Sequence, residues 1–139
     1  MYCDLDDIRG ALPEERIREL TDDDNVGMID QGHVDKAIEW AGSYIDSFIG
    51  AKYEVPLATV PDLIKHLSVD FTIWRLYSRR LDDDLPANIN ERYKHATNVL
   101  KSIRSGELSL ESSEEAASAY RTNKQTSDRL FNKDLLDTF

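Results

Sequence analysis

The chain has 139 residues, 40% of them hydrophobic and 32% charged, with a net charge of −10 and a pI near 4.7. This composition is typical of one soluble globular domain, and the acidic balance argues against tight binding of duplex DNA. No apolar run reaches membrane-spanning length, and the amino terminus shows no secretory leader. Cys3 is the only cysteine, so it cannot form an internal disulfide, and we expect a small, partly buried hydrophobe.

Two short helices are expected before residue 21. Asp4 can cap the first, with Asp7 three residues later, and Gly10 would end it. Pro13 suits the first position of the second helix, and the two glutamates that follow suit its positive end.

Residues 21–30 predict a polar loop that is superficially similar to a calcium-binding EF-hand loop. However, Val26 stands where a third oxygen ligand belongs, and His33 stands where the bidentate glutamate should be. We therefore interpret the segment as a solvated loop, with Asp30 capping the next helix.

Apolar residues recur every three or four positions in three longer segments, which predicts long helices near 31–50, 61–81 and 89–105. The middle segment is apolar on several sides, as is typical of a central helix. Asn88 and Glu91 resemble a capping box. The expected fold class is all-α: a small helical bundle with two to three long helices and an extended C-terminal tail. Its expected core side chains are Ile45, Phe48, Leu67, Phe71, Trp74 and Leu100.

Side chains able to carry chemistry are sparse. His66 lies one helical turn before Asp70, and we interpret the two as a structural pair that ties helices together. The three histidines fall on different predicted helices without zinc-like spacing, and no phosphate loop or nucleophile motif is present. We expect no enzymatic activity, no metal and no cofactor. The histidines are His33, His66 and His95.

A basic cluster, Arg75, Arg79 and Arg80, lies at the end of the second long helix. Cations there oppose the helix dipole favourably, so capping is one interpretation. Contact with an acidic partner surface is the other.

The C-terminal part divides the chain into a helical domain, residues 1–110, and a flexible linker with a docking segment, residues 111–139. Residues 111–127 are polar, and large apolar residues return only afterwards. We expect this apolar segment to dock on a neighbouring subunit or a virion partner; folding back on its own bundle is the alternative. Its apolar residues are Leu130, Phe131, Leu135, Leu136 and Phe139.

A set of short motifs, in order along nearly the whole chain, resembles a Mu-type phage protein family encoded among virion genes. They are YCxxxDI at 2–8, AxxxIDxFI at 41–49, KYxVPL at 52–57, LxVDxxxxRLY at 67–77 and RLFNKDxLxxF at 129–139. The resemblance implies a head–tail connector or neck subunit that forms a homo-oligomeric ring between portal and tail proteins. It implies a place in the virion, after assembly in the bacterial host cytoplasm, and offers no catalytic residues.

Two other functions stay open from the sequence: an acidic helical binding or regulatory module that sequesters a protein partner, and a small enzyme using His66, Asp70 or His95. In a ring, we expect the acidic stretches Asp22 to Asp24 and Asp82 to Asp84 to line the channel, where like charge would let DNA slide through.

Overall fold

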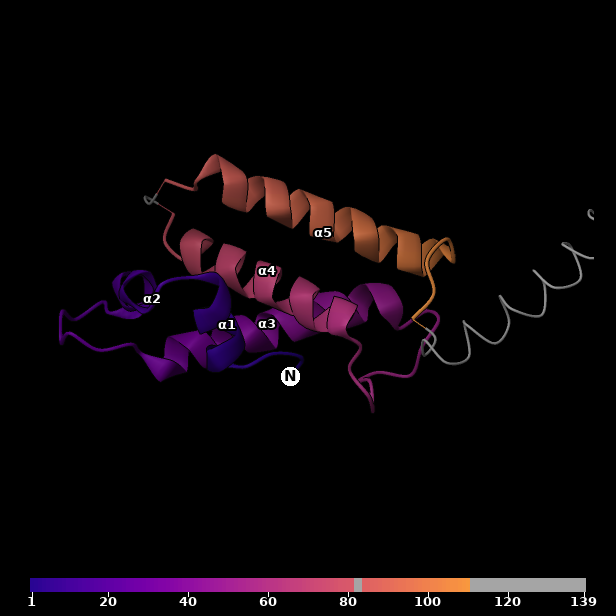
Figure 1. Cartoon of the computed structure of the whole chain (residues 1–139), viewed down its shortest axis with the longest axis horizontal. Coiled ribbons are helices and arrows are strands. Elements are labelled where there is room, and N and C mark those ends of the chain that lie inside the picture. The colour runs from indigo at the N-terminus through magenta and orange to yellow at the C-terminus, as the bar shows by residue number, and fades with distance from the viewer. Residues whose placement is uncertain (82–83, 111–139) are drawn as a thin grey trace, which may run out of the picture. The chain divides into compact units, whose positions relative to one another are not determined.

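A computed structural model of the chain describes residues 1–81 and 84–110, and the prediction of an all-α fold is confirmed there. The described residues contain five helices and no strand (Figure 1). Residues 1–108 form one compact unit. The helices are α1 (Leu5–Ala11), α2 (Glu14–Thr21), α3 (Gln31–Ile49), α4 (Asp62–Ser78) and α5 (Ala87–Ser105).

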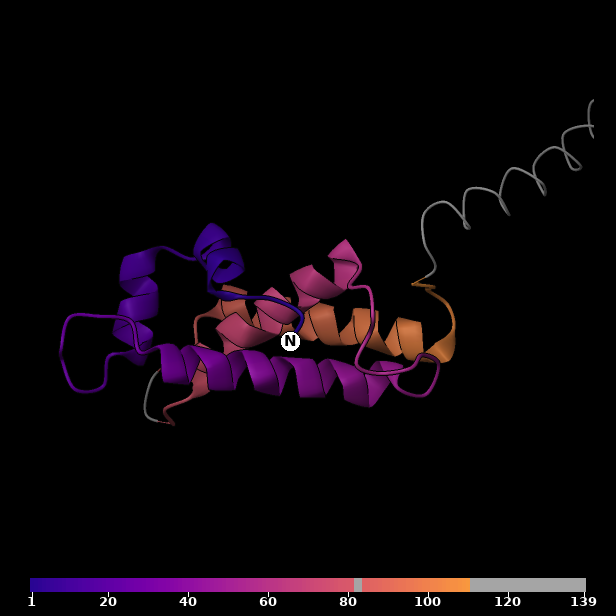
Figure 2. The ribbon, with the colours of Figure 1, turned by 90° about the horizontal axis from the view of Figure 1, so that it is seen from below.

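Helix α4 is central, as its apolar sides predicted. It packs against α3 and α5, and α1 and α2 contact it as well, while α2 also touches α3. Figure 1 shows α5 along one edge of the unit, with α1 and α2 near the opposite edge. Figure 2, turned by 90°, shows α3 running along the face nearest the viewer. The short helices therefore cover only part of the three long ones.

The core is built from side chains of all five helices. Ile45, Leu67, Phe71 and Leu100 are buried as predicted. A cluster including Ile8, Ile17, Val34, Ile38 and Ile73 joins the short helices to α3 and α4. Two expectations were too strong, because Phe48 and Trp74 are only partly buried.

The first helix begins as the sequence predicts. Asp4 Oδ1 accepts from the Asp7 backbone N–H at 2.9 Å, and Asp7 Oδ2 accepts from the Asp4 N–H at 3.0 Å. This reciprocal capping box satisfies two of the donors that a helix N-terminus leaves without partners. Asp30 likewise caps α3, accepting from the His33 N–H at 3.3 Å. The predicted stop at Gly10 is one residue early, since α1 ends at Ala11.

The ends of the later helices needed more correction. The capping box at Asn88 is wrong, because α5 begins at Ala87 with Pro86 as its N-cap and no side chain caps it. The fixed φ of proline already suits the position before a helix. Gly106 ends α5 in the left-handed conformation, with φ of 89°, as its type predicts. Helix α4 ends at Ser78, three residues before the predicted boundary at residue 81.

Candidate functional site

The loop that joins α2 to α3, residues 22–30, is called the acidic loop below. Figures 1 and 2 both show it projecting beyond the ends of the long helices. It carries two large apolar side chains that face solvent, Val26 at 66% and Met28 at 68% exposure. Apolar side chains held in solvent on a projecting loop are candidates for contact with a partner.

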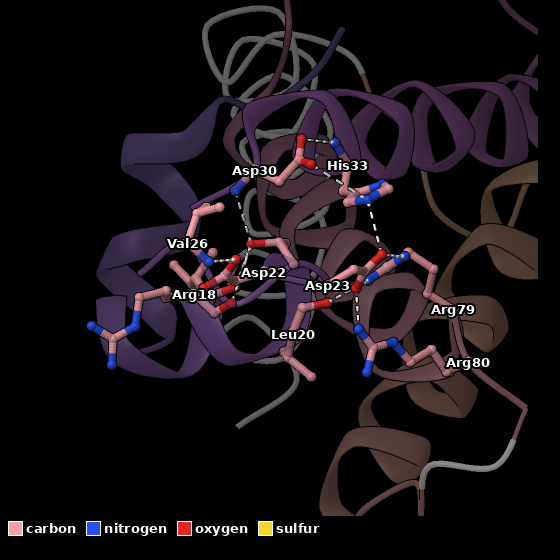
Figure 3. Close-up of polar contacts among 11 residues, drawn as sticks. Arg18, Leu20, Asp22, Asp23, Val26, Asp30, His33, Arg79 and Arg80 are labelled. Carbon is pink, nitrogen blue, oxygen red and sulfur yellow. Dashed lines mark hydrogen bonds and ion pairs between the residues drawn. The ribbon is translucent and has the colours of Figure 1, made fainter. Parts of the chain in front are cut away.

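Hydrogen bonds within the acidic loop fix its shape. Asp22 accepts from the backbone N–H groups of Val26 and Gly27, at 2.8 and 2.7 Å. At the base of the loop, the buried hydroxyl of Thr21 accepts from the Asp30 N–H at 3.1 Å. Figure 3 shows the Asp22 carboxylate turned inward, toward the loop backbone. The loop is therefore ordered by its own polar groups, as expected of an Asx-type turn.

Asp23 fastens the acidic loop to the end of α4 (Figure 3). Both terminal nitrogens of Arg79 donate hydrogen bonds to its carboxylate, at 2.9 and 2.5 Å, and Arg80 donates to the same carboxylate. His33 Nε2 lies 3.1 Å from the carboxylate on the α3 side. Arg79 also donates to the Leu20 carbonyl at 2.9 Å, so one guanidinium joins α2, the loop and α4. Hydrogen bonds from the two arginines hold the pKa of Asp23 well below its usual range.

These contacts bear on the predicted roles of the basic cluster and of the acidic stretches. Arg79 reaches across to α2 and the loop, and Arg80 joins it at Asp23. Asp23 is neutralised within the chain, so it is a poor candidate for repelling DNA in a channel. Residues 82–83 lie outside the described part. Contact between the three arginines and an acidic partner stays a prediction.

A second feature is a set of stacked rings between α3 and α5, called the aromatic face below. It consists of Trp40, Tyr44 and Phe48 on α3, Trp74 on α4 and Tyr93 on α5, all partly exposed. The Trp74 ring stacks on Tyr93 with centroids 4.3 Å apart and on Trp40 at 5.5 Å. The Trp40 and Tyr44 rings stack at 5.2 Å. Partly exposed aromatic rings are the side chains most enriched at protein interfaces.

Polar groups set the arrangement of these rings. The hydroxyls of Tyr44 and Tyr93 lie 3.3 Å apart, and this hydrogen bond together with burial raises the pKa of Tyr93. The Arg75 guanidinium lies 5.4 Å from the Trp40 centroid, and Arg104 lies 4.9 Å from that of Phe48. Cations at such positions are attracted to the ring faces. Arg75 therefore contributes to the aromatic face rather than to the anchoring of the acidic loop.

A third feature is a cleft of about 530 Å³ that α1, α4 and α5 line, with Asp70 at its wall. Asp70 faces Arg92 of α5 at 3.8 Å. Burial raises the pKa of Asp70, while the charges of Arg92, His66 and His95 oppose that rise. The predicted structural pairing is thus corrected: within residues 1–81 and 84–110, Asp70 forms an ion pair with Arg92, and no hydrogen bond or ion pair joins it to His66.

Cys3 is a further side chain that could carry chemistry. Cys3 is buried, with 7% exposure, as expected, and its Sγ lies 3.2 Å from the Ser68 hydroxyl and 3.7 Å from that of Thr72. Burial raises the pKa of its thiol, which disfavours the reactive thiolate. Across the described ranges, no three His, Cys, Asp or Glu side chains are placed to hold a metal ion. No helix in this part is long and apolar enough to cross a bilayer.

Sequence reasoning missed both surface features that an interface would use. The spacing of Trp40, Tyr44 and Phe48, four residues apart, was a signal for one helical face beside the core face. The sequence carried no signal for the ion pair between Asp23 and Arg79, because these residues lie fifty-six positions apart. The five predicted apolar docking residues, from Leu130 to Phe139, lie outside the described residues.

The described residues thus form an ordered helical unit with an anchored loop and a partly exposed aromatic face. Comparison with known families identifies it further. The family described as Bacteriophage Mu, Gp36 matches residues 2–128, nearly the whole chain, so the chain belongs to this family of phage proteins. The resemblance to a Mu-type phage family is thereby confirmed. The motif at 129–139 falls beyond the matched range.

A relative in Haemophilus influenzae, the Mu-like prophage FluMu protein gp36, is 29% identical over 82 residues. That alignment covers 59% of this chain and 55% of the relative, so the similarity spans only about half of the relative's length. The relative belongs to a Mu-like prophage, which agrees with the phage origin that the family indicates.

Proposed function

We propose that this chain is a structural protein of the head–tail connector, or neck, and that it assembles as a ring between portal and tail. Its partners are then other copies of itself and the portal and tail proteins, and its place is the virion, after assembly in the host cytoplasm. The role is structural rather than catalytic, and it requires no tight nucleic-acid binding.

The observation that carries the proposal is an apolar C-terminal segment beyond a helical unit that has its own core. In residues 1–108, side chains such as Ile8, Phe71 and Leu100 are fully buried. The segment adds five large apolar side chains, whose burial would contribute on the order of 5–10 kcal/mol before entropy is subtracted. A free energy of that size is enough to support association with another subunit. Membership of a phage protein family supports a role in phage assembly.

Deleting residues 128–139 tests this proposal. We expect the truncated chain to keep its melting temperature, but to fail to oligomerise and to fail to restore assembly of a phage that lacks the full gene. A matched full-length pair separates apolar contact from chain length. Phe131→Ser with Leu135→Ser should reproduce the defect, whereas Asn132→Ser with Thr138→Ser should not.

Two outcomes would contradict the proposal. Unfolding of the truncated monomer would mean that the segment belongs to the chain's own core. Absence of the full-length protein from purified virions would instead favour the acidic binding or regulatory module.

A further inference from the structure

The aromatic face has a basic border in an otherwise acidic chain. On α5, Thr97 contacts Tyr44 at 3.4 Å, which places this side of the helix along the face. Lys94 and Lys101 lie three positions before and four positions after Thr97, so they share its side, and both are exposed. Arg104, three positions further, covers the Phe48 ring.

The α3 side of the aromatic face is mixed in charge. Lys36 is exposed and lies one turn before Trp40, and the neighbouring positions along that side are Glu39, Ser43 and Ser47. The Arg75 guanidinium of α4 lies over the Trp40 ring. The basic border of the rings therefore comes mainly from α5 and from Arg75.

Charge is divided unevenly over the domain. Residues 1–30 contain ten acidic and three basic side chains, a formal charge of −7. Helix α5 contains four basic side chains and one acidic side chain, a formal charge of +3 with histidine neutral. The acidic part includes the acidic loop, which projects beyond the helices (Figures 1 and 2). One copy of the chain thus carries two surfaces of opposite charge.

The acidic loop complements the aromatic face in its apolar side chains as well as in its charge. It presents Val26 and Met28 to solvent, and the exposed Asp24 stands beside them. A methionine thioether packs favourably against aromatic rings, and a carboxylate suits a border of lysines. The loop needs little ordering to bind, because Asp22 and Asp23 already fix its backbone and its base.

We propose that the acidic loop of one copy docks on the aromatic face of a neighbouring copy, with Val26 and Met28 on the rings and Asp24 beside Lys94 and Lys101. The proposal deepens the connector function and rests on it for the assembly in which the contact forms. Because the two surfaces differ, the contact is head-to-tail, and such contacts close into rings when the rotation between copies allows it.

A single-stranded nucleic acid is the other ligand that a basic surface with stacked rings could attract. The field of a chain with a net charge of −10 opposes a polyanion, and the sugar–phosphate backbone offers no match for the acidic loop. A second copy supplies both the apolar side chains and the carboxylates. The observations therefore favour the second copy.

Charge-reversing substitutions in the full chain provide the first test, with self-association measured by sedimentation velocity. Asp24→Lys and Lys101→Glu should each weaken self-association by about two- to fivefold, the range for an exposed charge pair. The double variant carrying both changes should regain most of the loss. Glu54→Lys, an equal charge change at an exposed position of the loop after α3 and outside both surfaces, should have no effect.

Cross-linking tests the contact directly. Protein carrying Met28→Cys is mixed with protein carrying Lys94→Cys and oxidised gently; the buried native Cys3 does not compete. We expect a disulfide-linked dimer of the two different proteins. Replacing the second variant by Glu54→Cys, which lies outside both surfaces, should abolish that dimer. The same pair, co-expressed during phage growth, should cross-link in purified virions.

The outcomes separate this contact from the connector function. Protein that enters virions and self-associates, yet shows neither charge rescue nor cross-link, would overturn the contact and leave the function standing. Protein absent from virions would overturn the function, and the contact would then be judged on the cross-link in solution. Binding of a fluorescent single-stranded oligonucleotide at physiological salt, weakened by Lys101→Glu while self-association is unchanged, would overturn the contact in favour of nucleic acid.

Discussion

Truncation of Phe71 probes the packing on which the aromatic face depends. Phe71 is fully buried on α4, and its ring meets Tyr44 edge-on at 5.0 Å and Tyr93 edge-on at 5.8 Å. Phe71→Ala removes a whole buried ring and leaves a cavity, which costs about 3–5 kcal/mol. Each edge-on ring pair accounts for about 1 kcal/mol of that loss. In a domain of this size the melting temperature should fall by roughly 10–20 °C.

Urea unfolding followed by circular dichroism and tryptophan fluorescence measures the loss. Phe48→Ala is the matched control, because it makes the same change at a partly exposed ring of the same face. We expect that control to cost about 1 kcal/mol, since less apolar area is removed from water. A loss below about 1 kcal/mol for Phe71→Ala, or equal losses for both variants, would refute the assigned packing.

Four further predictions concern single polar groups. Arg79→Ala should speed hydrogen exchange and proteolysis in the acidic loop, whereas Arg75→Ala should not; slow exchange in both would contradict the anchoring. Because the pKa of Asp23 is depressed, the ionised carboxylate stabilises the folded state at any pH above its unfolded pKa of about 3.9. This stabilisation is lost as the pH falls through the folded pKa, so acid should release the loop even in the native chain. Because the pKa of Asp70 is raised, its protonated form stabilises the folded state at low pH. This stabilisation is lost as the pH rises through the folded pKa. Asp70→Asn should therefore raise the melting temperature at pH 7 more than at pH 4, and the reverse order would count against its burial. Cys3 should resist iodoacetamide in the native chain and react quickly in urea, and fast native labelling would show that the thiol is exposed.

Local sequence determined much of the fold. The caps at Asp4 and Asp30, the stop at Gly106 and the apolar periodicity of the long helices act over one or two turns, so residue spacing alone located them. The error at Asn88 had a local cause as well, because Pro86 already set the start of α5. The ordered motifs identified the phage family for the same reason, since they are read along the chain.

Long-range contacts were decided only by the tertiary structure. The anchoring of Asp23 by Arg79, the ion pair of Asp70 with Arg92, and the stack of Trp74 on Tyr93 each join residues of different elements. Which side chains meet in this way depends on how the helices cross and on which sides remain uncovered, and helical periodicity does not encode either. The sequence by itself therefore determined the helices, most of their ends and the family. The packing of α3, α4 and α5 decided that Phe48 and Trp74, which the sequence placed in the core, remain partly open to solvent at a basic border.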